Sequence, residues 1–308
     1  MAEPGAGAGV TAVGQGPSGV GEPGAGSGAG ATGRGWSGVG ELGAGLRAYG
    51  LIAAMWVRST MTYRVSFALT LVSNFVATGF DFVVILLMFG QVRGLGGFSF
   101  AEVAFLYGTT STAFGLADLS LGQLQRMGRR VRDGTLDTLL VRPVPVLAQV
   151  AADRFALRRL GRVTQGLLVL VWSLVLLDVA WTPLKVALVP VMVVSGWLIF
   201  AALMVAGAAF QFWAQDGSEV TSAFTYGGNT LLQYPPVIFA QDLVRGVVYM
   251  VPLAFVNWVP ALYVLGREAP AGLPAWAAFV SPLVAAVFWA GAGLAWRVGI
   301  RSYRSTGS

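Results

Sequence analysis

Long apolar runs follow one another along the chain from residue 65 onward, separated by short polar stretches. Four of them have about the 20 residues that a helix needs to cross a bilayer, namely 65–89, 163–181, 186–212 and 273–296. A further segment, 103–121, is as long but much more polar. Hydroxyl and carboxyl side chains are costly against lipid, so this helix is expected to face protein or an aqueous path.

The segment between residues 213 and 265 allows two interpretations. By hydropathy alone, 247–265 is the fifth crossing, although Pro252 and Pro260 interrupt it. Alternatively, 217–240 crosses with its polar side chains facing a pathway, and the Pro-broken segment enters the membrane from outside and returns. Hydropathy favours the first interpretation slightly. Either one predicts an all-α, polytopic membrane protein with six transmembrane helices.

The N-terminal part has no such apolar runs. Residues 1–45 are Gly, Ala, Ser and Pro repeats that cannot bury enough apolar surface to offset chain entropy, so a disordered extension is expected there. Residues 46–64 are compatible with a helix that has one mostly apolar face, formed by Ala48, Ile52, Met55, Trp56 and Ser59. Arg47 and Arg58 project on the other side. This pattern favours an interfacial helix whose guanidinium groups reach headgroup phosphates, or else an extension of the first span.

Composition supports a membrane protein and excludes much enzyme chemistry. Hydrophobic residues make up 56% and charged residues 11% of the 308 residues, against roughly one quarter charged in soluble domains. The chain contains no Cys and no His, which excludes disulfides, thiolate nucleophiles, Cys or His metal sites and His-based proton relays. Its one lysine, Lys185, follows Leu184, so a phosphate-binding G-x-x-x-x-G-K-[ST] loop is absent. We expect no metal or cofactor, and any ATP must be bound by another polypeptide.

Positive charge is concentrated between residues 123 and 162. This segment holds nine arginines and three aspartates, a balance of +6 that equals the net charge of the whole chain. The arginines are Arg126, Arg129, Arg130, Arg132, Arg142, Arg154, Arg158, Arg159 and Arg162. With both termini inside, six more fall on the same side, against about three basic residues outside, Arg93, Lys185 and Arg267. The positive-inside rule therefore predicts a multi-pass protein of the cell membrane with both termini cytoplasmic.

The Arg-rich segment divides into short pieces. Residues 123–132 are basic and compatible with a helix, Asp133 and Gly134 form a turn, 135–141 are apolar-periodic, and 142–145 (RPVP) stop the element. A second helix then returns to the membrane. A short rigid element bounded by Gly and Pro suits a membrane protein that receives force from a soluble partner. Alternatively, the arginines only bind anionic headgroups and set topology.

Residues 134–143, GTLDTLLVRP, resemble the G-x-[LF]-[DE]-x-L-L-x-x-P signature in the cytoplasmic loop of type-2 ABC exporter permeases. Residues 234–238 (YPPVI), 252–261 (PLAFVNWVPA) and 301–308 (RSYRSTGS) are also similar to an actinobacterial and firmicute subfamily of these permeases. The resemblance covers about residues 46–308. It implies a six-span, non-enzymatic subunit that works with a second permease, identical or different, and with two ABC ATP-binding subunits.

In that family the interfacial helix and the loop helix, called the coupling helix, rest on the ATPase. Carried over, the candidates for coupling contacts are Arg132, Asp133, Gly134, Leu136, Asp137, Leu139, Leu140, Arg142 and Pro143. Gly134 would permit the turn, the leucines would fill a groove on the partner, and the charged residues would set the register. The resemblance implies membrane lipids as further partners and no nucleic acid. The cargo stays open, because apolar helices with a few hydroxyls suit lipids, amphipathic drugs or peptides alike.

Acidic side chains within the spans are candidates for a transport pathway. Asp81 and Asp118, with Thr109 and Thr112, could line a path, or the acids could pair with basic groups. Asp178 lies near the outer boundary and is expected to be solvated. An intramembrane aspartyl protease is disfavoured, because residues 115–118 (GLAD) differ from the Gly-x-Gly-Asp arrangement of that chemistry. The alternatives to an ABC permease are an ion-coupled secondary transporter, for which inverted repeats are not evident, and a non-transporting scaffold.

Overall fold

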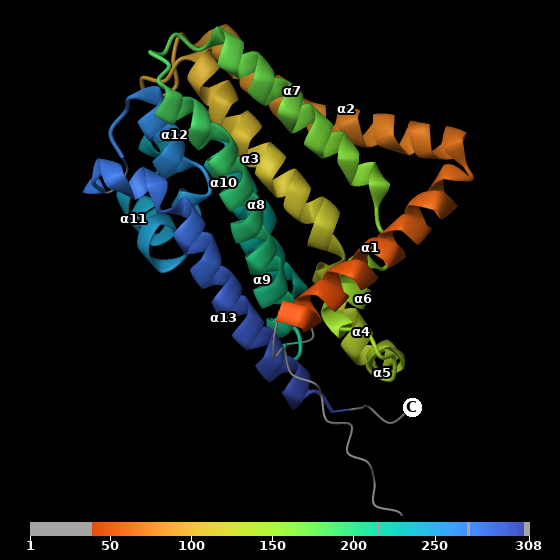
Figure 1. Cartoon of the computed structure of the whole chain (residues 1–308). Coiled ribbons are helices and arrows are strands. Elements are labelled where there is room, and N and C mark those ends of the chain that lie inside the picture. Colours follow the sequence, from red (N-terminus) through yellow and green to blue (C-terminus); the bar gives the residue numbers. More distant parts are fainter. Residues whose placement is uncertain (1–38, 215, 270–271, 305–308) are drawn as a thin grey trace, which may run out of the picture. The chain divides into compact units, whose positions relative to one another are not determined.

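The computed structural model describes residues 39–214, 216–269 and 272–304, and every regular element in these ranges is a helix (Figure 1). The all-α expectation is therefore confirmed for this part of the chain. The expected disordered extension falls largely on residues 1–38, which lie outside the described residues.

Helix α1 (Val39–Met61) begins earlier than the residue 46 expected from the sequence, so 39–45 are helical. The Thr62–Tyr63 turn separates it from the first long helix. Of the expected apolar face, Met55 and Ser59 are exposed. The side that is buried or half-buried instead includes Ala48, Tyr49, Ile52, Ala53 and Trp56. The face is thus rotated relative to the prediction, because Tyr49 and Ala53 pack against the protein.

In the part of the chain that the structure describes, four long helices are apolar enough, by length and composition, to cross a membrane. They are α2 (Arg64–Gln91), α7 (Leu160–Leu176, preceded by the turn η2, Leu157–Arg159), α8 (Pro183–Phe210) and α13 (Ser281–Ser302). Helix α7 ends before the predicted residue 181. Leu177 is extended, and Thr182 then caps α8 by accepting a hydrogen bond from the Lys185 N–H.

Helix α3 (Phe100–Leu121) corresponds to the polar segment 103–121 and occupies the centre of the bundle. Ser99 and Glu102 form a capping box at its start. The helix packs against α7 and α8 (Figure 1). Every residue from 103 to 115 is buried. Close packing depends on glycine, because a Cβ at Gly166 of α7 would lie 2.7 Å from the backbone nitrogen of Thr112. The expectation that this helix faces protein is confirmed.

The region between α8 and α13 is built from short pieces. A continuous helical run comprises α9 (Ser218–Ser222), the π-helical turn η3 (Ala223–Gly227) and α10 (Gly228–Leu232). The turn η4 (Pro236–Ile238) separates it from α11 (Gln241–Arg245), which continues into a second π-helical turn, η5 (Gly246–Met250). After η6 (Leu253–Phe255) come α12 (Trp258–Leu265) and η8 (Ala275–Phe279).

Residues 247–265 are therefore not the single fifth helix that hydropathy favoured. Pro252 lacks an N–H group, and the helix ends at Met250 just before it. Pro260 does not break α12, because it stands in the first turn, where its N–H would have no partner within the helix. The run 218–232, in contrast, is continuous and packs against α8 and α3.

Candidate functional site

The Arg-rich segment forms a compact set of short helices at one end of the bundle, which we call the loop end (Figure 1). In order they are η1 (Gly122–Arg126), α4 (Met127–Arg132), α5 (Thr135–Leu140) and α6 (Val146–Ala152). Gly134 joins α4 to α5 with φ of 65°, a left-handed conformation that favours glycine. The predicted order of basic helix, turn, apolar element and Pro-rich stop is present.

A second hydrophobic core, the loop-end cluster, holds these short helices against the ends of two long ones. It is formed by Leu124, Met127, Val131, Leu136, Leu147 and Val150 of the loop, with residues of α8 and α13 such as Ala208 and Trp296. The loop is covalently joined to α3 and α7, yet it packs on α8 and α13. It is therefore anchored to four long helices.

This packing changes the role of two predicted contact residues. Leu136 is fully buried within the chain, so it cannot fill a groove on a partner as expected. Asp137 also lies on the inner side, beside the hydroxyl of Tyr303, where burial and then this carboxylate raise the pKa of Tyr303. Leu139 is half-buried against the same cluster. A helical period identifies an apolar side but does not show whether it faces the chain or a partner.

The exposed part of the loop is its tip. Leu140 is 41% exposed and Val141 86% exposed, and Arg142 and Pro143 follow them at the surface. Asp133, at the preceding turn, is exposed as well. Val141 was not among the predicted contact residues, although its apolar character beside Leu140 was visible in the sequence.

Three buried glutamines fix the loop backbone. The Gln149 amide donates to the carbonyls of Leu139 (3.0 Å) and Val144 (2.8 Å), which holds the end of α5 and the Pro-rich stop together. The side-chain oxygen of Gln211, at the end of α8, accepts from the N–H of Gly128 at 2.7 Å. In the same way Gln123 donates to a backbone carbonyl across the loop. Glutamines give no motif in the sequence, so their role could not be predicted.

Ion pairs use some of the loop arginines within the chain. Arg130 pairs with Asp153, and Arg132 pairs with Asp216 in the connection after α8. Most of the others, including Arg126, Arg129 and Arg142, are exposed. The predicted contact residue Arg132 therefore also ties the loop to the neighbouring connection.

The predicted pathway residue Asp118 belongs to a buried ion pair. Its carboxylate lies 3.1 Å from the Arg159 guanidinium and accepts from the Tyr226 hydroxyl at 3.4 Å. Arg159 also donates to the Asp118 carbonyl at 2.7 Å. Of the two roles left open for this acid, the structure shows pairing with a basic group.

Thr109 and Thr112 are likewise engaged within the bundle. The Thr112 hydroxyl donates to the carbonyl of Gly108, one turn earlier in α3. Thr109 contacts the fully buried Asn257 at 2.9 Å. The Asn257 amide also lies within hydrogen-bonding distance of Thr110 and of the carbonyls of Leu106 and Leu232. Asn257 thus joins the start of α12 to α3 and to the end of α10, which no local sequence signal indicated.

Asp81 differs from the other predicted pathway residues because it is exposed on α2. It stands at the edge of the face that packs on α3 and α7, where Thr78, Phe82 and Ile85 are buried. One turn earlier, the carbonyl of Thr78 accepts a hydrogen bond from the buried Tyr107 hydroxyl of α3 at 3.3 Å. Asp81 therefore borders the surface of α3 that lies between α2 and the end of the run 218–232. We call this surface the front of α3.

The run 218–232 presents a polar strip on its accessible side. Glu219, Tyr226 and Thr230 recur at helical spacing, and each is exposed or half-buried. Tyr234, which is half-buried, follows after the helix ends. Two polar edges, one on α2 and one on this run, thus flank α3.

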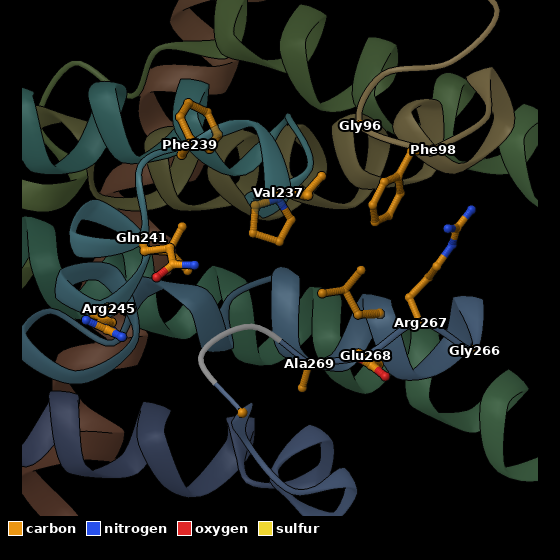
Figure 2. A pocket seen from close by; sticks show the side chains of 14 residues that line it. Gly96, Phe98, Val237, Phe239, Gln241, Arg245, Gly266, Arg267, Glu268 and Ala269 are labelled. Atoms are coloured by element: carbon orange, nitrogen blue, oxygen red, sulfur yellow. The ribbon is translucent and has the colours of Figure 1, made fainter.

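A cavity of about 810 Å³ opens at the other end of the bundle (Figure 2). Its lining combines apolar and charged side chains, including Phe98, Val237, Phe239, Gln241, Arg245, Arg267 and Glu268. Arg267 makes two 2.9 Å hydrogen bonds to Glu102 and stacks over Phe98 at 4.6 Å. Arg245 also lies at this end. With Arg93, Lys185 and Arg267, four basic residues of the described chain therefore lie on this side.

Comparison with protein families identifies the chain. A model of the family described as ABC-2 family transporter protein matches residues 75–307, which is more than half of the chain. The chain therefore belongs to the ABC-2 transporter family. Comparison with curated proteins and with solved structures found no match.

Membership makes this chain a multi-pass membrane protein and a permease of an ABC transporter. Permeases of this family are membrane transport components, generally not catalytic themselves, and they imply an ABC ATP-binding subunit as partner. The match confirms the resemblance inferred from the loop signature. It also covers the loop, the run 218–232 and α13.

Proposed function

We propose that the chain is the membrane subunit of an ATP-driven exporter, and that its exposed loop tip is the contact with a separate ABC ATPase. The observation that carries the proposal is the combination of a rigid loop and an apolar, solvent-exposed tip. Leu140 and Val141 stand outside the loop-end cluster, while Gln149 fixes the backbone that presents them. The protein needs no cofactor of its own, since ATP is bound by the partner.

The proposed membrane arrangement has six crossings, with the loop end in the cytoplasm of the cell and α1 at the membrane interface. Among the described residues, fifteen basic residues on the loop-end side against four on the other support this orientation. The fifth crossing is the run 218–232 with its flanking residues, because it is continuous and packs on α3 and α8. The Pro-broken residues 241–265 then enter from outside and return.

The proposed pathway lies in front of α3, and a second permease subunit, identical or different, completes it. Support comes from the two polar edges that flank α3 and from the low burial of α2, whose apolar face is left for lipid or a partner subunit. ATP closing the ATPase dimer would tilt the two permeases and open this path. Lipids or other amphipathic molecules suit such a surface.

The test is co-purification with the ATPase and ATP-dependent transport in proteoliposomes. In the double variant Leu140→Asp with Val141→Asp, we expect complex formation to fall by at least about tenfold, because apolar contacts are replaced by buried charge. The control is Val92→Asp, an apolar side chain that is 43% exposed, close to the 41% of Leu140, and lies away from the loop end. Wild-type complex formation and transport in the tip variant, once correct insertion is verified, would overturn the coupling assignment.

A further inference from the structure

Charged side chains beside α3 differ in whether they have an ion-pair partner among the described residues. Asp118 is neutralised by Arg159, and Glu102 by Arg267. Asp81 on α2 and Arg162 on α7 make no such contact within 4.0 Å in the described part of the chain. A charge that is buried or lies on an apolar helix surface is costly unless it is paired, so each of the two indicates a counter-charge from outside the chain.

The two charges converge on one side chain, Tyr107. Its hydroxyl donates to the Thr78 carbonyl of α2 at 3.3 Å and accepts from the Gln165 amide of α7 at 2.7 Å. Asp81 lies one turn beyond Thr78 along α2, and Arg162 lies one turn before Gln165 along α7. At about 1.5 Å per residue, the two leave their helices roughly 9 Å apart along the bundle.

Arg162 is held in place but not neutralised. Its guanidinium lies over the rings of Phe114 (5.2 Å) and Tyr226 (5.7 Å), so it faces the run 218–232 in front of α3. The Nη1 atom is buried and has no hydrogen-bond partner in the described residues. Aromatic faces attract a cation but cannot accept its directed N–H bonds as an oxyanion does. An acidic group would fit beside this nitrogen.

We propose that Asp81 and Arg162 form a binding site for a zwitterionic amphipath, with an ammonium group at Asp81 and a phosphate or carboxylate at Arg162. The site names the substrate class of the pathway and so rests on the proposed function. The two charges stand far enough apart to bind both ends of such a group. A molecule with one charge leaves one of the two side chains unpaired, which gives the site its selectivity.

The experiment uses the permease–ATPase complex in proteoliposomes and four fluorescent acyl probes. One carries a phosphoethanolamine headgroup, one only phosphoglycerol, one only a quaternary ammonium, and one is a zwitterionic acyl dipeptide. We expect ATP-dependent transport of a zwitterionic probe to be at least about tenfold faster than that of either singly charged probe. Whether the phosphoethanolamine probe or the dipeptide is preferred tells whether the zwitterion is a phospholipid or a peptide.

The variants separate the two ends of the site. Asp81→Asn should slow the zwitterionic probes about tenfold and abolish discrimination against phosphoglycerol, while Arg162→Gln should abolish discrimination against the ammonium probe. Asp81→Glu and Arg162→Lys should keep the preference. The controls are Asp178→Asn and Arg93→Gln, which alter exposed charges outside the site.

Three outcomes would overturn the inference. The first is ATP-dependent transport by the wild type without preference among the probes, which leaves the proposed function intact. The second is an equal loss for all probes in the Asp81 and Arg162 variants, which indicates a structural role. The third is a preference for zwitterionic probes that persists in both Asp81→Asn and Arg162→Gln, which shows that other residues select the headgroup. A complex that never forms, or moves no probe, counts against the proposed function itself.

Discussion

Helices α2 and α3 are neighbours in the chain but opposite in character. The most apolar 18-residue stretch of α2 has a mean hydropathy of 2.0, and only 17% of it is buried within the chain. Helix α3 carries five hydroxyl or carboxyl side chains between 109 and 118, yet it is enclosed by α7, α8, α10 and α12. Lipid selects apolar side chains at the periphery, and the centre tolerates polar ones that find partners there. Polarity therefore indicates where a helix lies within the bundle, and a polar helix is not a poorer candidate for a membrane crossing.

The largest effect is expected from filling the close contact between α3 and α7. Gly166→Val places side-chain atoms where a Cβ already lies 2.7 Å from the Thr112 nitrogen and 3.0 Å from the Ser111 carbonyl carbon. Backbone cannot move aside easily, so we expect a loss of about 3 kcal/mol, measured as thermal unfolding in detergent. Gly79→Val on α2 is the control, because it has no atom within 4 Å. Equal stability of the two variants would mean that α3 is not tightly enclosed.

A smaller effect is expected at the polar centre. Asn257→Leu removes the amide that contacts Thr110 and the carbonyls of Leu106 and Leu232, leaving buried acceptors unpaired. We expect a loss of about 2 kcal/mol in the same assay. The matched change on α2 is Asn74→Leu, which removes one hydrogen bond to the Arg158 carbonyl and should cost about 1 kcal/mol or less. A reversed order would contradict the contrast between the two helices.

The smallest effect concerns the loop end of α3, where the Tyr49 hydroxyl donates to the Ser120 carbonyl at 2.9 Å. Burial raises the pKa of Tyr49 from 10.0 to about 12. The folded state thus holds this proton more tightly, and the resulting stability is present below pH 10 and is lost as the pH rises to about 12.

Between pH 9 and 12, the free energy of unfolding should therefore fall by roughly 1 kcal/mol or more further for the wild type than for Tyr49→Phe. Thermal midpoints recorded across this pH range measure the difference. Tyr63→Phe is the control, because Tyr63 is 73% exposed. Parallel curves for wild type and Tyr49→Phe would show that α1 is not docked through this residue.

The sequence predicted the long helices because their signal is local. Helix α2 closely matches the predicted 65–89, whereas α8 begins at Pro183, three residues before the predicted 186 and with proline at its first helical position, and ends at Phe210. The structure of the Pro-broken segment after residue 240 was harder to predict. Its fold depends on Asn257, whose partners lie in α3 and at the end of α10, far away in the chain.

The order and boundaries of the loop helices were predictable, but the side of α5 that packs against the bundle was not. Gly134 and the Pro-rich stop marked the boundaries of α5 correctly. Which leucine points inward is decided by α8 and α13, which come much later in the chain, so Leu136 was assigned to the wrong side. The pairing of Asp118 with Arg159 is likewise a property of the folded bundle, since 41 residues separate the two.

The hydrogen bond between Gln211 and the Gly128 N–H has a mechanical consequence. Together with the loop-end cluster, it makes the loop one solid piece with the terminus of α8. Displacement of α5 would then be transmitted at once to α8 and α13, without first straightening the peptide segments that lead to α3 and α7. Under the proposed function, a contact made at the loop tip would therefore act on the ends of α8 and α13 as well as on α3 and α7.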